Sequence, residues 1–346
     1  MRRRRFLSAM ATWAAIPPFS LRDSGLLAPG LPASRDASVR PAPGGARSGR
    51  DRAAELYALV LGSAQDAGYP QVGCYTERCE RGRALHAEGR GRYVSSLALV
   101  EPAEERFYLV DATPDIAQQI DLIAEPSFRR RAAERRPFDG IFLTHAHIGH
   151  YLGLAVLGNE GMGISDTPVY CTRAMADFLS RNGPWSLMVD QGRIVPHPLA
   201  LDRWHRIDEH LEVKLWKVPH RDEFSDTVAF VFRSAQSSIL FLPDINAWSL
   251  WDRSVAEAIA SVDVALLDAT FWSLDELPGR SVEDAPHPII LQTMDLLQEV
   301  VDGGRSRVIL THLNNSNPAL DEGGPEQAEV LRRGFEIARE GTRLEL

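Results

Sequence analysis

Short apolar runs and helical patterns alternate along the chain from about residue 55 to its end. Short runs that are apolar almost throughout are typical of strands buried on both faces of a sheet. They lie at 56–62, 94–101, 106–112, 138–145 and 168–171 in the first half, and at 211–219, 226–234, 237–244, 262–269 and 306–312 in the second. The runs at 211–219, 226–234 and 237–244 follow one another through short connections, so we expect consecutive strands of a meander.

Between these runs, apolar residues recur at the spacing of an amphipathic helix. Helices are predicted at 115–124, from 151 onward, at 174–180, 255–259 and 289–301, and over a final stretch at 325–340. Both halves of the chain hold a group of strands with helices between them. The sequence therefore predicts two sheets packed face to face with helices outside, an α/β (α+β) architecture. We expect a single domain over residues 53–346.

The first twenty residues, MRRRRFLSAMATWAAIPPFS, place a basic run before a short apolar stretch at 6–16. That stretch is too short to span a bilayer, and basic residues followed by an apolar block are typical of an export signal. Arg3 and Arg4 in RRRFL resemble the pair of a twin-arginine signal. The sequence thus predicts an export signal at 1–23, a disordered linker at 24–52 and a periplasmic or secreted protein. A basic tail on a cytoplasmic protein is the alternative.

The charge is distributed unevenly along the chain. Residues 1–50 carry a net charge of +7 and the remainder −16, within a total of −9. An acidic body argues against nucleic acid or an anionic membrane as the main partner. We therefore expect a small-molecule substrate, no nucleic acid and no stable membrane anchor, with the export machinery as a partner of the precursor.

Five histidines and one aspartate stand where predicted strands end. They are His145, His147, His150, His220, Asp244 and His312. Loops at strand ends are positioned by a rigid scaffold and often carry ligands. Imidazole nitrogens and carboxylate oxygens are the usual ligands of zinc and of non-haem iron. The sequence predicts one or two divalent metal ions, with zinc preferred and iron or manganese as alternatives.

Four segments in this order, THAHIGH, PHRDEFSDTVAF, FLPD and LTHLNN, resemble the ligand motifs of the metallo-β-lactamase fold. The resemblance covers about residues 55–340 and implies a four-layer αββα sandwich with the site along one edge. It implies that His145, His147 and His220 hold a first metal. It implies that His150 and His312 hold a second, with Asp244 bridging the two. Asp111 in YLVDATPD matches the structural aspartate of that family.

A narrower resemblance is carried by GSAQDAGYPQVGC, SSLALV, LLDATFW and LTHLNNSNP. These segments are similar to those of coenzyme PQQ synthesis protein B and its relatives. The export signal and the fuller histidine motif indicate a paralogue of that protein rather than the biosynthetic protein itself.

Gly149 departs from the usual HxHxDH motif, in which aspartate stands before the third histidine. Glycine can neither bind the second metal nor accept a proton from a bridging water. The first site keeps three histidines, enough for an open tetrahedral zinc site that supplies hydroxide near neutral pH. Gly149→Asp is expected to tighten the second metal. Without that aspartate, His150, His312 and Asp244 form the two-histidine, one-carboxylate set of non-haem iron oxygenases.

Three functions follow from these residues. The first is a metal-dependent hydrolase that uses a metal-bound hydroxide on a small-molecule ester, phosphodiester or lactone. The second is a mononuclear iron oxygenase linked to PQQ-type biosynthesis, and the third is a non-catalytic metal-binding paralogue. For the hydrolase we expect Asp244 and His287 to be catalytic. The place of His287 in APHPII resembles that of the proton-donating histidine of RNase Z-like hydrolases, although a histidine between prolines can also be an exposed loop residue.

The three cysteines are too few for a disulfide framework. Cys74 and Cys79 stand five positions apart in GCYTERCERG. They are candidates for a structural metal site, for a disulfide formed after export, or for free thiols. Cys171 ends a buried strand and is expected to be a packing residue.

Overall fold

The computed structural model describes residues 56–277, 279 and 286–346. The predicted export signal (1–23) and linker (24–52) lie outside the described residues, as does the predicted start of the domain at 53.

The first sheet has the strand order β14-β1-β2-β3-β4-β5-β6. Its strands are β1 (Tyr57–Gly62), β2 (Ser96–Glu101), β3 (Arg106–Val110), β4 (Gly140–Phe142), β5 (Thr167–Cys171), β6 (Ile194–Pro198) and β14 (Arg343–Glu345). Strands β3 to β6 are parallel, and β2 runs antiparallel to both β1 and β3. The strands β1, β3 and β4 therefore end at the same edge of this sheet.

The second sheet has the order β13-β12-β11-β10-β9-β8-β7. Its strands are β7 (Trp204–Arg206), β8 (Glu212–Lys217), β9 (Val228–Arg233), β10 (Ser238–Leu242), β11 (Val264–Asp268), β12 (Arg307–Thr311) and β13 (Glu336–Ile337). Antiparallel pairing of β8, β9 and β10 confirms the predicted meander. Because β10, β11 and β12 are parallel, they end with β8 at one edge.

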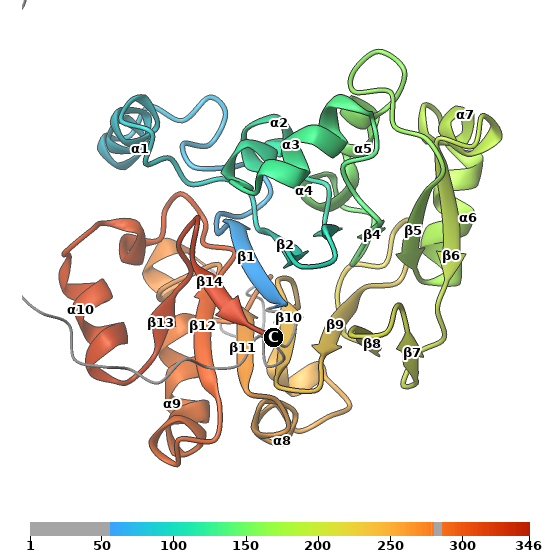
Figure 1. Cartoon of the computed structure of the whole chain (residues 1–346). Coiled ribbons are helices and arrows are strands. Elements are labelled where there is room, and N and C mark those ends of the chain that lie inside the picture. The colour runs from blue at the N-terminus through green and yellow to red at the C-terminus, as the bar shows by residue number, and fades with distance from the viewer. Residues whose placement is uncertain (1–55, 278, 280–285) are drawn as a thin grey trace, which may run out of the picture. The chain divides into compact units, whose positions relative to one another are not determined.

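Helices cover the outer face of each sheet (Figure 1). Those on the first sheet are α2 (Ile116–Gln119), α3 (Pro126–Ala133), α4 (Ile148–Tyr151), α5 (Leu154–Leu157), α6 (Arg173–Arg181) and α7 (Trp185–Asp190). Those on the second are α8 (Val255–Ala260), α9 (Ile290–Asp302) and α10 (Pro325–Arg332). The remaining helical segments are α1 (Glu77–Ala87) and the 3₁₀ turns Ile120–Leu122, Trp248–Leu250, Leu274–Glu276 and Pro318–Leu320.

A hydrophobic core lies between the two sheets, and two further cores lie beneath the helices. In the central core, Phe142 of β4 packs edge-on against Phe230 and Phe232 of β9, with ring centroids 5.5 and 5.1 Å apart. Burying a side chain of this size stabilises the fold by roughly 1.5–3 kcal/mol. The strands are apolar on both faces because each face meets a core. The predicted four-layer αββα sandwich is confirmed.

Two predicted helices differ from the structure for backbone reasons. The helix predicted at 325–340 ends at Arg332, because Gly334 adopts φ 82°, a left-handed conformation that ends a helix. Phe335 then turns into the core and β13 follows. The helix predicted from 151 begins at Ile148 and is divided at Gly153, where an added Cβ would lie 2.1 Å from the Thr113 carbonyl oxygen.

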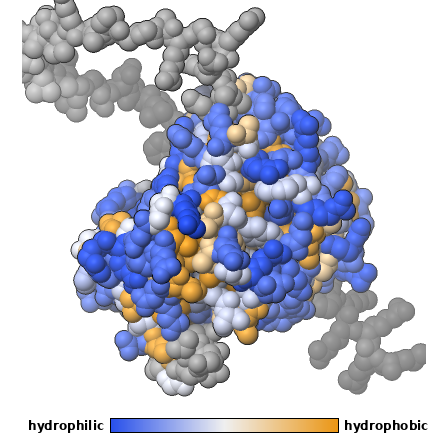
Figure 2. Space-filling model, turned by 90° about the horizontal axis from the view of Figure 1, so that it is seen from below, coloured by the Kyte–Doolittle hydropathy of each residue, from blue (hydrophilic) through white to orange (hydrophobic). Residues whose placement is uncertain are grey.

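The face of the molecule seen from below is mostly hydrophilic, with smaller hydrophobic patches between the polar residues (Figure 2). Among the described residues, no helix has the length and apolar character needed to cross a membrane.

Candidate metal centre

The predicted first-metal residues meet at the edge where β4, β8 and β10 end. The Nδ1 atom of His147 lies 2.9 Å from His145 Nε2 and 3.1 Å from His220 Nε2. Asp244 completes the group, with Oδ2 3.3 Å from His145 Nε2 and 3.2 Å from His220 Nε2. One ligand atom from each of the four residues lies within 4.8 Å of every other. The sequence predicted all four.

A second group shares Asp244 and contains His150, His312 and Asp66. Asp66 Oδ1 lies 3.1 Å from His150 Nε2 and 3.3 Å from His312 Nε2. Asp244 Oδ2 is 3.7 Å from the first of these nitrogens and 4.0 Å from the second. A single carboxylate oxygen thus lies within 4.0 Å of four imidazoles, the position expected of a bridging ligand.

Sequence reasoning missed Asp66. It stands four residues after the end of β1, in a loop that also contains Gly68, and no histidine motif includes it. The rule that selected the other ligands, a polar residue after a strand end, applies to Asp66 as well. Applying that rule to β1 would have found it.

Each of the five histidines has one ring nitrogen that faces the ligand group, the inner nitrogen, and one that points away from it, the outer nitrogen. An oxygen atom accepts a hydrogen bond from each outer nitrogen. His145 Nδ1 lies 3.0 Å from Thr144 Oγ1, which itself donates to Asp111, and His312 Nδ1 lies 3.0 Å from Thr270 Oγ1, which donates to Asp268. The corresponding contacts of the other three are His150 Nδ1 to Asp111 Oδ2 at 2.7 Å, His220 Nδ1 to Asn246 Oδ1 at 2.8 Å, and His147 Nε2 to Glu223 Oε2 at 3.0 Å. Each outer nitrogen therefore donates its proton outward, which leaves the inner nitrogen with a lone pair.

Five inner imidazole nitrogens and two carboxylates converge in one small space. Burial alone would lower the pKa of His150, but Asp111 and Asp66 outweigh burial and raise that pKa well above its usual range, so the carboxylates of this cluster favour positive charge. This arrangement therefore fits one or two divalent metal ions. Complete burial and the neighbouring His150 hold the pKa of His145 well below its usual range, and burial also lowers the pKa of His147. Both rings are thus neutral near pH 7, the form that binds a metal.

Asp111 connects the second group to the sheet. It follows β3 and adopts φ 62°. Its Oδ1 accepts a 2.9 Å hydrogen bond from the Thr144 amide, and its Oδ2 accepts one from His150 Nδ1. The residue is completely buried. Asp111 therefore orients His150 and fixes the start of the histidine loop, a structural role like the one the family resemblance implied.

His287 contacts two carboxylates and forms a third, overlapping group with Asp244, Asp268 and His312, whose ligand atoms also lie within 4.8 Å of one another. Its Nδ1 is 2.9 Å from Asp268 Oδ2 and 3.1 Å from Asp244 Oδ1. Burial alone would lower the pKa of this imidazole, but Asp268 and Asp244 outweigh burial and raise its pKa to about 10. His287 is buried rather than an exposed loop residue, and the two carboxylates favour its protonated form.

A cleft of about 680 Å³ opens next to His287. Its lining is mostly apolar and includes Trp248, Leu250, Val255, Ile289 and Leu296. The cleft also touches Asn246, the residue that orients His220. The metal groups thus lie next to a space suited to an organic molecule.

Residues 106–313 match the family described as "Beta-lactamase superfamily domain", a match that covers more than half of the chain. The chain belongs to the beta-lactamase superfamily. The matched range includes every histidine of the two metal groups and Asp244, whereas Asp66 lies before it.

Within this superfamily, the chain is 28% identical over 313 residues to coenzyme PQQ synthesis protein B of Pseudomonas entomophila (strain L48), covering 84% of this chain and all of the relative. Among solved structures, Zn²⁺-bound PqqB from Methylobacterium extorquens is similar, with a TM-score of 0.70, 25% identity, and coverage of 84% and 100%. A diphosphatase from the PhnP family shares the fold, with a TM-score of 0.57, 18% identity, and coverage of 84% and 97%. The predicted relationship to the superfamily and to coenzyme PQQ synthesis protein B is confirmed.

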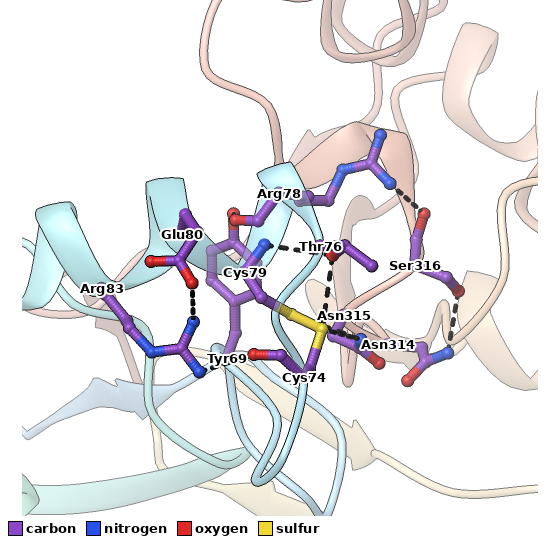
Figure 3. The surroundings of a disulfide bond; sticks show 10 residues. All are labelled: Tyr69, Cys74, Thr76, Arg78, Cys79, Glu80, Arg83, Asn314, Asn315 and Ser316. Atoms are coloured by element: carbon purple, nitrogen blue, oxygen red, sulfur yellow. Dashed lines mark hydrogen bonds and ion pairs between the residues drawn. A yellow bond between two sulfur atoms is a disulfide. The ribbon is translucent and has the colours of Figure 1, made fainter.

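Cys74 and Cys79 form a disulfide beside the loop that follows His312 (Figure 3). Asn315 Nδ2 lies 3.4 Å from Cys74 Sγ and 3.5 Å from Cys79 Sγ. In this state neither sulfur is a thiolate ligand. Cys171 is a buried free thiol in the core under the first sheet, where it packs as expected, and burial raises its pKa to about 12.

Proposed function

We propose that this protein is a metal-dependent hydrolase, similar to PQQ synthesis protein B, that acts on a small-molecule ester, phosphodiester or lactone. The proposal depends on one observation: Asp244 Oδ2 lies within 4.0 Å of imidazoles from both ligand groups, next to a mostly apolar cleft. One or two divalent ions would occupy these groups, with zinc preferred because Zn²⁺-bound PqqB is a structural relative. Iron and manganese are the alternatives.

The ligand residues divide into three roles. His145, His147 and His220 would hold the first ion, His150 and His312 the second, and Asp244 both. A bound divalent ion lowers the pKa of a coordinated water and polarises the substrate oxygen. Thr144, Asn246 and Thr270 hold the imidazoles in the tautomer that presents a lone pair inward.

His287 would donate a proton to the leaving group. Asp268 and Asp244 hold its Nδ1, so Nε2 is the nitrogen left to meet a substrate in the adjacent cleft. Asp268, which is not among the proposed ligands, contacts Nδ1 and raises the pKa of this ring, which favours the protonated form that a general acid requires. The apolar cleft walls, including Trp248 and Ile289, would bind the organic part of the substrate and exclude water.

The alternative function, an iron oxygenase, requires a second site with two histidines and one carboxylate. Asp66 adds another carboxylate to His150, His312 and Asp244, so the residues present depart from that set. Hydrolysis is therefore the function that this geometry supports best. We further propose that the mature protein is periplasmic or secreted, on the basis of residues 1–23.

The test starts from protein purified without added metal. Metal content is measured, the apoprotein is reloaded separately with zinc, manganese or iron, and each form is assayed on nitrophenyl esters, bis-nitrophenyl phosphate and lactones. Turnover that depends on the metal and disappears in His145→Ala would support the proposal. Oxygen uptake by the iron form would favour the oxygenase, and bound metal without turnover on the whole panel would favour a non-catalytic protein.

A further inference from the structure

Gly149 lies directly against Asp66. A Cβ atom built on Gly149 would be 2.3 Å from Asp66 Oδ1, 2.7 Å from its Cγ and 2.8 Å from its Cα. Such distances are shorter than non-bonded atoms reach in proteins. A side chain at position 149 and the observed position of Asp66 are therefore mutually exclusive.

The carboxylate of Asp66 fills this space and faces the second ligand group. Its Oδ1 contacts both His150 Nε2 and His312 Nε2, and it falls within 4.8 Å of the Asp244 ligand oxygen. The Asp66 side chain is only 16% exposed. It comes from the loop after β1, not from the α4 helix that carries Gly149 and His150.

Backbone hydrogen bonds hold the chain on both sides of Asp66. The Ala64 amide donates to the Tyr93 carbonyl at 2.8 Å, and the Gln65 amide donates to the Leu313 carbonyl at 2.9 Å. On the other side, the Gly68 amide donates to the Gln65 carbonyl at 2.7 Å. Because Leu313 adjoins His312, the aspartate and this histidine are held in one rigid unit.

We propose that Asp66 is a carboxylate ligand of the second metal site, and that position 149 is glycine because the Asp66 carboxylate occupies the space of its side chain. The second site then has four protein ligands: Asp66, His150, His312 and the shared Asp244. This inference rests on the metal binding in the proposed function. It changes the expectation drawn from the sequence, since Gly149→Asp would displace the Asp66 carboxylate rather than add one, and should therefore not tighten the second metal.

The ligand role is tested by metal affinity, measured with Zn²⁺ by competition against a chromogenic chelator. Asp66→Ala is expected to weaken the second equivalent about 100-fold or more and to leave the first within about 3-fold, since loss of a supporting contact alone costs about 10–100-fold. Asp66→Asn keeps the shape without the charge and should also weaken the second equivalent by more than about 100-fold, beyond the range of a supporting contact. It decides the question if the alanine variant does not fold. Asp121→Ala removes an exposed aspartate and is the matched control.

A loss smaller than about 100-fold for the second equivalent in the folded variants would overturn the inference, because a supporting contact alone explains it. A wild-type protein that binds no Zn²⁺ would instead contradict the proposed function. The two failures are therefore distinguishable, because the first site serves as an internal reference.

The steric part is tested in the metal-free protein by thermal unfolding. Alanine in place of glycine normally favours a helix, yet Gly149→Ala in α4 should lower Tm, because its methyl group meets Asp66. The decrease should be smaller in an Asp66→Gly background, where the carboxylate is gone and the methyl group meets only the main chain of residue 66. Gly183→Ala, whose Cβ would have no neighbour within 4 Å, is the control. An equal decrease in both backgrounds would refute the steric explanation for Gly149.

Discussion

Asp268 holds the ring of His287: its Oδ2 lies 2.9 Å from His287 Nδ1. The carboxylate itself is fixed by the backbone, since Oδ2 accepts from the Ile245 amide at 3.0 Å and Oδ1 from the Thr270 amide at 3.0 Å. The orientation of the imidazole is therefore set by two neighbouring strands rather than by a mobile side chain.

If His287 protonates the leaving group, His287→Gln should lower kcat by roughly 10²–10⁴-fold, the usual contribution of general acid catalysis. The loss should be greatest for substrates with poor leaving groups. It should be small for nitrophenyl esters, because nitrophenolate leaves without taking up a proton. Metal content and Tm serve as checks that the site is intact. Equal losses on good and poor leaving groups would argue against proton donation.

Replacing His147 removes the imidazole that contacts both His145 and His220. His147→Ala should therefore bind one equivalent of zinc fewer than the wild type, as measured by metal analysis after dialysis. His197→Ala is the matched control, because His197 is exposed and belongs to neither metal group. Unchanged zinc content in His147→Ala would show that the first-site assignment is wrong.

Removing the metal should destabilise the folded protein. A ligand that binds only the native state, present at a thousand times its Kd, stabilises that state by about 4 kcal/mol. Treatment with EDTA should thus lower Tm, and added zinc should restore it. The effect should shrink in His145→Ala. A Tm that does not respond to chelation would mean that the buried histidines are stable without a cation.

The Cys74–Cys79 disulfide leaves Cys171 as the free thiol among the described residues, which determines how the protein should react with thiol reagents. At pH 8 a thiol with a pKa of about 12 is only about 10⁻⁴ ionised, so Cys171 should label slowly in the native state. Oxidised protein treated with EDTA should show no fast-reacting thiol, because Cys74 and Cys79 are paired. Two fast thiols released by EDTA alone would instead indicate a zinc-thiolate site at these cysteines.

The export proposal has a direct measurement. Residues 1–50 fused to a reporter protein should deliver it to the periplasm. The double substitution Arg3→Lys and Arg4→Lys should reduce delivery, if this pair is read as a twin-arginine signal. Delivery that is the same with both lysines would point to a signal of another type.

The sequence predicted ten of the fourteen described strands and six candidate ligands, because both depend on local patterns. It missed the short strands β6, β7, β13 and β14, whose runs are too short or too polar to form such a pattern. Buried strands are apolar on both faces, and His145, Asp244 and His312 each follow such a strand. Asp66 also follows a strand, but it was not predicted because it stands four residues past the end of β1 and outside every histidine motif. Its partners His150 and His312 are 84 and 246 residues away, so no local pattern connects it to them. Only the pairing of strands brings these residues together. Similarly, the end of α10 depends on the left-handed conformation of Gly334, which an amphipathic pattern does not reveal.

The bridge between Ala64 and Leu313 joins the loop after β1 to the loop after β12. Residues 145–244 supply the whole first ligand group, whereas the second needs residues 66 and 312 together. A chain still under synthesis could thus build the first group long before the second. The number of metal ions bound would then report how far the domain has folded, and a fragment that stops short of residue 312 should hold one ion at most.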